Sequence, residues 1–479
     1  MGLLSSLSRE QKEAIGLLQI GTFLEYFDLM LYVHMAVLLN ELFFPQTDPH
    51  TASLLAAFAF CSTFVFRPIG ALIFGWLGDH IGRKSTIILT TMIMCVSCIV
   101  MAILPTYAQI GIAATWIITL CRIAQGMSTM GEGIGAQIYL TESIRRPACY
   151  PAVGSLSVAC GLGSMGALGV GALVTSISLN WRYAFLGGAV IAFVGAFARV
   201  RLRETPDFLE MKRQQIKNLK AQCDTSDDED LSLRFLKALK ETNPAQHLEK
   251  IIEFRKQTRE SVKETVRDWK GGVKLRTFLS YMLIHCGWPL TFYLTFIYFN
   301  PLLRQNFGYS PEDIIRHNFY LSIVLLISNV SWALLGYRIY PLKLLKTRGV
   351  STLILMIALP FLIANLTSAL QLFFIQALLL LVLLGDVPAA PILLNRFPVF
   401  RRFTSASILF AFGQAVMNII TAFGLVSLGR YFGTFGLWLI TLPVTAAFLY
   451  AVFHFEWLDR ETARELQKEW EEDRLSYGT

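Results

Sequence analysis

The strongest constraint on the fold is a series of long apolar runs, each about as long as a membrane-spanning helix, which needs about 20 mainly apolar residues. The hydrophobic fraction of 54%, the charged fraction of 16% and the mean hydropathy of +0.51 are too apolar for a soluble protein of 479 residues. We therefore predict an all-α membrane protein. Six runs precede and six follow a charged segment, at residues 14–40, 51–78, 86–104, 109–139, 148–178 and 182–200, then 274–303, 315–337, 349–366, 369–395, 403–429 and 433–455.

Lys and Arg are distributed unevenly over the ends of these runs, leaving aside the charged segment and the C-terminal tail. Short cytoplasmic loops of membrane proteins are enriched in Lys and Arg. We therefore place both termini and the charged segment in the cytoplasm, and the same bias explains the net charge of +8 without a nucleic-acid partner. The cytoplasmic side holds Arg9, Lys12, Arg83, Lys84, Arg145, Arg146, Arg338, Lys343, Lys346, Arg348, Arg396, Arg401 and Arg402, and the other side holds Arg182, Arg304, Arg316 and Arg430.

A charged turn that contains glycine connects the second and third runs. It reads Gly75-Trp-Leu-Gly-Asp79-His-Ile-Gly82-Arg83-Lys84. Because charge is costly inside a bilayer, the turn must lie at the membrane surface, and its glycines permit a tight reversal.

The first run carries two acidic residues within apolar sequence. Gly21, Glu25, Asp28 and Tyr32 follow one another at steps of four, three and four, so they share one face of a helix. We expect the carboxylates to face a water-filled cavity or a cation, as in a proton-coupled carrier. The alternative is that one of them is only a structural ion-pair partner.

The second and fourth runs add further polar residues. Arg67, beside Pro68, is expected to pair with Glu25 or Asp28, or to bind a carboxylate of the solute. A purely structural bridge is an equal alternative. In the fourth run Gln125 precedes Glu132, whose flanking glycines would let a helix or ligand approach the carboxylate closely.

The second half carries fewer charges within its runs. Asp386, between Gly385 and Pro388, is the main acidic candidate, because a broken helix would expose it. Tyr293 and its aromatic neighbours either line a cavity or pack against lipid and core. Glu142, at the cytoplasmic end of the fourth run, is expected to form an interfacial ion pair with Arg83 or Arg145.

The charged turn resembles the signature loop of the major facilitator superfamily, with His80 where a permanent cation is usual. Other stretches resemble its metabolite:proton symporters, which include proline/betaine, 2-oxoglutarate, shikimate and citrate carriers. These stretches are Gly21-Thr-Phe-Leu-Glu25-Tyr26-Phe27-Asp28, Phe66-Arg67-Pro68-Ile-Gly70, Arg122-Ile-Ala-Gln125-Gly126 with Gly131-Glu132, Trp181-Arg182-Tyr-Ala-Phe185-Leu186, Arg203-Glu204-Thr205-Pro206-Asp-Phe208 and, more weakly, Phe397-Pro398 with Arg402-Phe403-Thr404.

The resemblance implies roles for individual residues. Asp79 would lie near the start of the eleventh helix, around Thr404, and Arg83 near Glu142, so that both latch the outward-open state. Glu25, Asp28, Arg67 and Glu132 would belong to the central cavity and the proton path. We assign proton coupling to Glu25, Asp28 and Glu132, solute binding to Arg67, Tyr32, Gln125, Tyr293 and Asp386, and the conformational latch to Gly75, Asp79, Gly82, Arg83, Lys84 and Glu142.

We therefore predict a major facilitator fold of 12 transmembrane helices in two six-helix bundles. The expected function is proton-coupled uptake of a small carboxylate or zwitterion, such as an organic acid, amino acid or betaine, by alternating access. The expected location is the inner membrane of a bacterium. The protein would act as a monomer in the lipid bilayer, driven by the proton gradient without a cofactor or metal.

Two alternatives are a facilitator or exporter of the same fold, and a membrane sensor or scaffold that does not transport. An enzyme is not expected, because the sequence shows no nucleophile and base pair, metal cluster or phosphate loop. The predicted divisions are an N-terminal bundle at 1–200, a cytoplasmic linker at 201–273, a C-terminal bundle at 274–457 and a cytoplasmic tail at 458–479. The linker holds 16 Lys or Arg and 14 Asp or Glu between positions 201 and 272.

Overall fold

The computed structural model describes residues 7–43, 63–176, 180–213 and 273–476, and every regular element in these residues is helical. The chain divides into two compact units. One unit contains Met1–Thr205 and Arg276–Thr479, and the other is Pro206–Leu275. Of the second unit, residues 206–213 are described as helix. The predicted four-part division of the chain stays a prediction.

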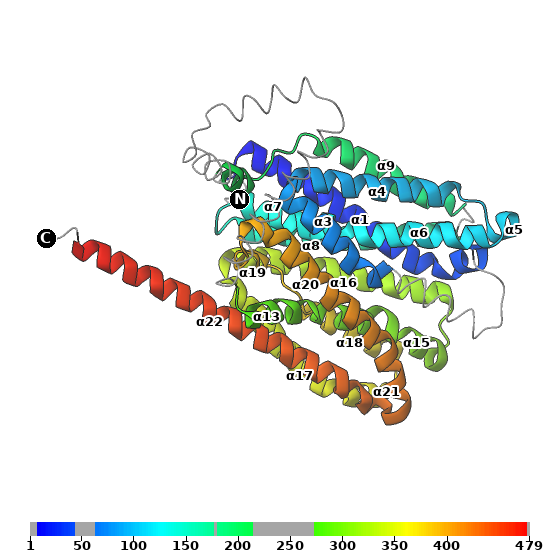
Figure 1. The fold of residues 1–479 in the computed structure, drawn as a ribbon. Coiled ribbons are helices and arrows are strands. Elements are labelled where there is room, and N and C mark those ends of the chain that lie inside the picture. Colours follow the sequence, from blue (N-terminus) through cyan, green and yellow to red (C-terminus); the bar gives the residue numbers. More distant parts are fainter. Residues whose placement is uncertain (1–6, 44–62, 177–179, 214–272, 477–479) are drawn as a thin grey trace, which may run out of the picture. The chain divides into compact units, whose positions relative to one another are not determined.

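The first half of the larger unit contains six predicted runs (Figure 1). The fourth run is broken at Gly111, between α5 and α6, and then continues through a π-helix, η1 (Met130–Ile134), where the backbone takes up an extra residue. Part of the second run falls on residues 44–62, outside the described residues. The remaining elements are α1 (Arg9–Phe43), α3 (Arg67–His80), α4 (Arg83–Ile103), α5 (Tyr107–Ile110), α6 (Ile112–Thr129), α7 (Gly135–Ser143), α8 (Cys149–Ser176) and α9 (Arg182–Arg199).

The second half is more interrupted than the sequence suggested. The seventh run becomes α13 (Leu275–His285), α14 (Gly287–Tyr293), π-helix η3 (Leu294–Tyr298) and α15 (Asn300–Phe307). The tenth run ends early, as α18 (Ala369–Leu381), and resumes at α19 (Ala390–Leu394). The other elements are α16 (Pro311–Arg338), α17 (Pro341–Ala364), η4 (Val399–Arg401), α20 (Arg402–Ile419), η5 (Ile420–Gly424), α21 (Leu425–Phe432), η6 (Gly433–Leu437) and α22 (Trp438–Ser476).

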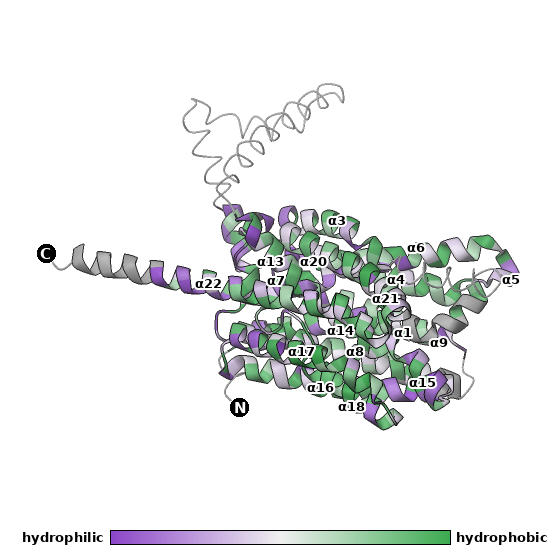
Figure 2. Cartoon of the chain, turned by 90° about the horizontal axis from the view of Figure 1, so that it is seen from below, coloured by the Kyte–Doolittle hydropathy of each residue, from purple (hydrophilic) through white to green (hydrophobic). Residues whose placement is uncertain are grey.

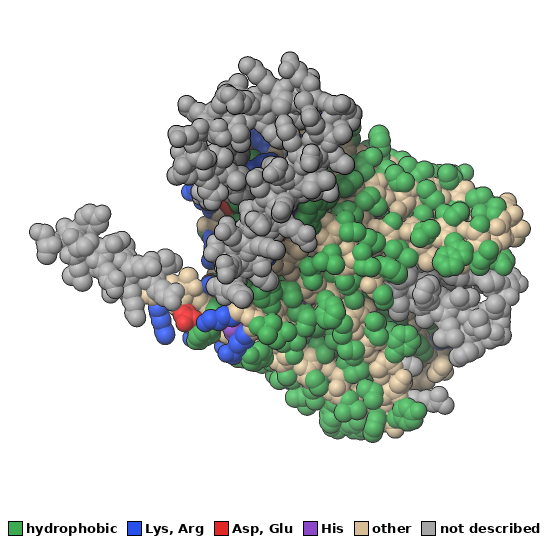
Figure 3. Space-filling model, viewed as in Figure 1, with side chains coloured by type: hydrophobic (Ala, Val, Ile, Leu, Met, Phe, Trp, Pro, Cys, Tyr) green, Lys and Arg blue, Asp and Glu red, His purple; other side chains and the backbone are tan. Residues whose placement is uncertain are grey.

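Length and composition support a membrane location. Among the described residues, eight helical stretches are long and apolar enough to cross a bilayer, and two more, Arg182–Phe197 and Ala369–Leu381, are apolar but shorter. Hydrophobic colours dominate the helix bodies in Figure 2, and apolar side chains cover most of the face in Figure 3. An apolar outer surface of this kind is suited to lipid.

The two halves meet along two helix pairs. Helix α8 packs on α16, and α3 packs on α20. Small residues allow close approach: a Cβ on Gly154 would lie 3.0 Å from the Cα of Ala333, and one on Gly75 would lie 2.8 Å from the Cα of Thr404. These contacts place residues of both halves around a shared interior.

Basic residues gather at one end of the larger unit, which we call the basic end. It contains the turn between α3 and α4, the start of α8, the junction of α16 with α17, and the start of α20. Lys and Arg side chains are visible there in Figure 3, beside the emerging part of α22. The Lys and Arg residues at the basic end include Arg83, Lys84, Arg145, Arg146, Arg338, Lys343 and Arg401.

Helix α22 runs without interruption past the predicted boundary at residue 457. Its Asp459 pairs with Arg396 at 3.1 Å and accepts a hydrogen bond from the Tyr340 hydroxyl. Burial, together with this bond, raises the pKa of Tyr340 above its usual range. These contacts fix the path of α22 at the basic end.

Candidate functional site

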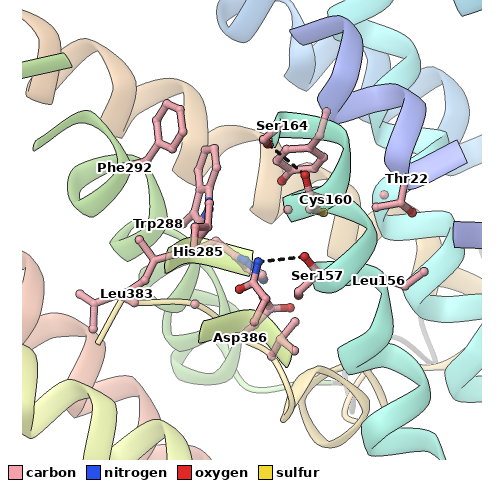
Figure 4. A pocket seen from close by; sticks show the side chains of 18 of the residues that line it. Thr22, Leu156, Ser157, Cys160, Ser164, His285, Trp288, Phe292, Leu383 and Asp386 are labelled. Atoms are coloured by element: carbon pink, nitrogen blue, oxygen red, sulfur yellow. Dashed lines mark hydrogen bonds between the residues drawn. The ribbon is translucent and has the colours of Figure 1, made fainter. Parts of the chain in front are cut away.

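A cavity of about 130 Å³ lies between the two halves. The first half contributes α1, η1, α7 and α8, and the second half contributes α13, α14, α16, α17, α20 and the interrupted segment after α18. Figure 4 shows Ser157, Cys160 and Ser164 of α8 opposite His285 and Trp288 of the second half. A cavity of this volume admits about four water molecules or a small solute.

Glu25 is the acidic residue that the first half presents to this cavity. Its side chain lines the cavity and the residue is only 6% exposed. Its Oε2 atom has no hydrogen-bond partner among the described residues. An ionised carboxylate in such a position is costly unless it binds a proton or a cationic group.

The second half contributes Asp386 and Arg348 to the cavity. Arg348 was counted among the cations of the cytoplasmic side, just before the run at 349–366; in the structure it lies within α17, which begins seven residues earlier, and is 5% exposed. Its guanidinium donates to the backbone oxygens of Val387, at 2.7 Å, and Leu383. Both carbonyls belong to the interrupted segment, which is no longer helical and so leaves them free to accept.

Aromatic rings form much of the remaining wall. Tyr26 of α1 meets Trp288 of α14 edge to face, with ring centroids 6.3 Å apart, and so joins the two halves. Phe292 stacks on Trp288 at 4.8 Å, and the Arg348 guanidinium lies 5.0 Å from the centre of the Trp332 ring. Such walls suit a solute with apolar carbon next to a charged group.

Asp28 does not pair with Arg67. Its Oδ2 lies 3.4 Å from the Arg122 guanidinium, and both side chains are buried. Gln125 accepts a hydrogen bond from Arg122 at 3.0 Å, and its amide group contacts the sulfur of Cys98 at 3.6 Å. Asp28 and Gln125 therefore form one network inside the first half, away from the residues that line the cavity.

Glu132 lies in the π-helix η1 and is also paired within the first half. Its Oε2 is 2.6 Å from the guanidinium of Arg199, the last residue of α9, and its Oε1 accepts from Thr91. Arg199 also donates to the carbonyls of Leu17 and Leu18 of α1. Arg199 could not be recognised from the sequence, because it ends an ordinary apolar run and only the fold brings it to Glu132.

The remaining predicted solute-binding residues are dispersed. Arg67 donates to Gln414 of α20 at 3.1 Å, and within the described residues it makes no ion pair with Glu25 or Asp28. The expected ion pair is therefore corrected to a hydrogen bond between the halves. Tyr293 contacts the carbonyl oxygen of Ala422 at 3.4 Å, and the side chain of Tyr32 falls outside the described residues.

At the basic end, Asp79 of α3 accepts three hydrogen bonds from the start of α20. The donors are the Phe403 amide at 3.2 Å, the Thr404 amide at 2.9 Å and the Thr404 hydroxyl at 2.7 Å. The first residues of a helix carry unpaired N–H groups, so a carboxylate is a natural acceptor there. This is the contact that the resemblance implied.

Glu142 connects the same two halves. Its carboxylate lies 3.2 Å from Arg83 and 3.0 Å from Arg402, and it accepts from the Thr205 hydroxyl at 2.6 Å. Arg83 also donates to the Val399 carbonyl of the second half at 2.7 Å. The Arg83 contact was expected, whereas Arg402 had been counted as a loop residue and is 5% exposed.

The other residues of the turn shape its backbone. Gly82 has φ = 130°, a conformation that side chains disfavour. The amides of Arg83 and Lys84, at the start of α4, donate to Glu204 at 3.0 and 3.3 Å. His80 contacts the Trp76 carbonyl at 2.8 Å and takes no part in the contact with α20. Among the described residues, no three His, Cys, Asp or Glu side chains are grouped to hold a metal.

Comparison with known proteins agrees with this architecture. The model of the sugar (and other) transporter family matches residues 17–453. Solved structures of similar fold include the proton:xylose symporter XylE, with a TM-score of 0.71, 14% identity and coverage of 94% of this chain and 95% of that one. The structure of the human organic anion transporter MFSD10 is similar with a TM-score of 0.62 and 16% identity, over 94% of this chain and 100% of that one.

Three curated relatives are similar over part of their length. The Escherichia coli inner membrane metabolite transport protein YhjE is 37% identical over 199 residues, which are 40% of this chain and 45% of the relative. The Salmonella typhimurium proline/betaine transporter is 34% identical, over 41% of each chain. The Escherichia coli shikimate transporter is 31% identical, over 44% of this chain and 50% of the relative. The chain thus matches at most half the length of these relatives.

Proposed function

Because the chain belongs to the sugar (and other) transporter family and has the fold of the major facilitator superfamily, we propose that it carries a small charged solute across the inner membrane of a bacterium together with a proton. The observation that carries the proposal is Glu25, a buried carboxylate with an unpartnered oxygen facing a cavity between two helical halves. The basic end would face the cytoplasm, following the distribution of Lys and Arg.

Among the three carboxylates assigned to proton coupling, we choose Glu25 as the proton-binding group. Asp28 and Glu132 are each paired with a buried arginine, Arg122 or Arg199, so each pair is close to neutral without a proton. Glu25 has no such ion pair among the described residues. Protonation would therefore neutralise an unpaired carboxylate and would not have to break an ion pair with Arg67.

The solute would bind between Glu25 and two charged residues of the second half, Asp386 and Arg348. Cavity groups of both signs suit a zwitterion or a carboxylate, because each charge of the solute then meets an opposite charge. The ring of Trp288 would cover its apolar part. The relatives named for proline, betaine and shikimate transport are consistent with a solute of this size and charge.

The hydrogen bonds of Asp79 and the ion pairs of Glu142 would form a gate that closes the basic end. They join the halves directly, so opening that end requires all of them to break together. Gly75 contributes by letting α3 and α20 approach, and Gly82 by allowing the turn. In the conformation described here the gate is closed, and alternating access would require its opening on the cytoplasmic side.

The test is uptake into proteoliposomes under an imposed pH gradient, with labelled amino acids, betaines, dicarboxylates, polyols and hydroxy acids. We expect one class to accumulate uphill, and a protonophore to abolish the accumulation. Glu25→Gln should abolish uphill accumulation but retain exchange of labelled for unlabelled solute, since exchange needs no release of the proton.

Asp28→Asn is the comparison variant on the same helix: it leaves the buried Arg122 without its ion-pair partner, so it should lower the unfolding midpoint, while the protein that remains folded should still accumulate solute uphill. Full pH-driven accumulation by Glu25→Gln would contradict the proton role of this residue. Downhill movement alone, in the unmodified protein, would favour a facilitator or exporter. No movement of any solute would favour a sensor or scaffold.

A further inference from the structure

A second hollow, which we call the lateral groove, opens on the outside of the larger unit. Its volume is about 720 Å³, and its walls are almost entirely apolar. Helices α1, α8 and α9 of the first half form one side, and α16 of the second half forms the other. The lining includes Gly16, Phe23, Pro151, Leu162 and Leu334.

The groove is open to its surroundings. A Cβ built on Gly16 would meet no atom within 4 Å. Leu334 is 60% exposed and Leu162 is 40% exposed, although both lie in helices of membrane-spanning length. Large apolar side chains exposed on such helices face hydrocarbon and not water. The groove is therefore a concavity in the lipid-facing surface.

Its depth can be estimated along α1. The helix begins at Arg9, seven residues before Gly16 and fourteen before Phe23, which also lines the groove. At 1.5 Å per residue the groove extends from about 10 to about 20 Å from the start of the helix. One leaflet contributes about 15 Å of hydrocarbon. The groove thus lies in the leaflet at the basic end and reaches about the middle of the bilayer.

Exposed cations lie within a few residues of the groove lining, at the basic end. Lys12 lies one helical turn before Gly16, and Arg338 lies one turn after Leu334. Arg145 and Arg146 lie a few residues before Pro151, and all four side chains are exposed. The nearby acidic residues of α1 are Glu10, which pairs with Arg203, and Glu13. The mouth therefore carries an excess of positive charge at headgroup depth.

We propose that the lateral groove binds one acyl chain of an anionic phospholipid from the leaflet at the basic end, with the phosphate at Arg145 and Arg146. An apolar channel that starts below a group of arginines matches the two parts of such a lipid. Basic pockets between membrane helices on the cytoplasmic side bind anionic headgroups in this way. The binding would be independent of which solute is carried.

The groove also connects lipid binding with conformation. Its walls come from both halves, and α16 must move relative to α1 and α8 when the halves rock. A lipid chain that fills the groove in this conformation, with the gate at Asp79 and Glu142 closed, would stabilise that conformation over one in which the groove changes shape.

The experiment is native mass spectrometry of the full-length protein released from nanodiscs that contain phosphatidylcholine and phosphatidylglycerol. We expect one phosphatidylglycerol to be retained in preference to phosphatidylcholine. Arg145→Gln combined with Arg146→Gln should weaken this retention roughly 25-fold, since each basic residue near the surface contributes about fivefold. Gly16→Leu should reduce it by filling the groove.

Gly187→Leu is the matched control. Gly187 is an exposed glycine of α9 with nothing within 4 Å of its added Cβ, but it lies near the opposite end. The Gly187→Leu variant should retain phosphatidylglycerol as the unmodified protein does. Equal retention of both lipids, or unchanged retention in the double arginine variant, would overturn the proposal even if Gly16→Leu failed to fold. The proposal would also be overturned if the protein were released as a dimer without bound lipid, with a second copy of the chain in place of the lipid.

Discussion

The two halves interrupt their helices beside an acidic residue, but they use the interruption differently. In the first half Gly131 and Glu132 lie in a π-helix that continues into α7, and Glu132 is 1% exposed and paired with Arg199. In the second half Gly385 and Asp386 lie where the helix has ended, and Asp386 lines the cavity. The first interruption forms a buried ion pair, and the second exposes a charge.

The difference follows from where each arginine finds its acceptors. Arg199 reaches a carboxylate and two helix carbonyls, so Glu132 is neutralised within its own half. Arg348 reaches the carbonyls of the interrupted segment, so its charge is only partly compensated and Asp386 remains partly exposed. We infer that the first half provides a rigid frame and the second half provides part of the solute site.

The largest expected effect comes from breaking the buried pair. Arg199→Gln leaves Glu132 buried beside a neutral partner, and loss of one partner of a buried pair costs about 3–5 kcal/mol. We expect the thermal unfolding midpoint to fall strongly. The midpoint is measured in detergent by tryptophan fluorescence. Arg203→Gln, which removes an exposed pair with Glu10, should leave the midpoint unchanged.

The double variant Arg199→Gln with Glu132→Gln separates charge from packing. It leaves no unpaired charge, so it should recover much of the lost stability. If the single variant unfolds at the same temperature as the unmodified protein, Glu132 does not depend on Arg199, and the contrast between the two interruptions fails.

A smaller effect is expected from the glycines beside the two acids. A Cβ on Gly131 would lie 2.4 Å from Thr90, whereas one on Gly385 would meet only Arg348, at 3.8 Å. Gly131→Ala should therefore destabilise the protein by about 1–3 kcal/mol through overpacking, and Gly385→Ala should be tolerated. The same unfolding measurement tests both. Equal midpoints for the two variants would show that the interruptions are packed alike.

The sequence predicted the fold well because its signals are local. Twelve apolar runs, the charge bias of the loops and the turn around Asp79 each depend on residues close in the chain, and together they indicated the facilitator fold. The contacts of Asp79 with Thr404, and of Arg83 with Glu142, followed from the resemblance and are present.

The partners of the cavity charges could not be predicted in the same way. The pairs of Asp28 with Arg122 and of Glu132 with Arg199 connect helices that are distant in the sequence. Arg348 resembled a loop cation because it lies close to Lys343 and Lys346, yet α17 begins before it. Which arginine meets which acid depends on helix rotation, and several choices satisfy the same apolar pattern.

The smallest effect is expected from a change at Asp386, and it tests whether the second half contacts the solute. Asp386→Asn removes a charge that lines the cavity and that makes no ion pair within the described residues, so the fold should not depend on it. If the solute contains a cationic group, loss of one charge-assisted contact of about 1.5–3 kcal/mol should raise the KM for uptake roughly tenfold or more. The unfolding midpoint should stay unchanged.

The control for this prediction is Glu132→Gln with the same two measurements. A buried acid that stabilises the frame should change the midpoint, and its effect on KM should be the smaller of the two. An unchanged KM for Asp386→Asn, with full transport, would mean that the exposed acid does not contact the solute. The positive part of the solute would then bind against the ring of Trp288, and the charge that the second half contributes to the solute site would be that of Arg348.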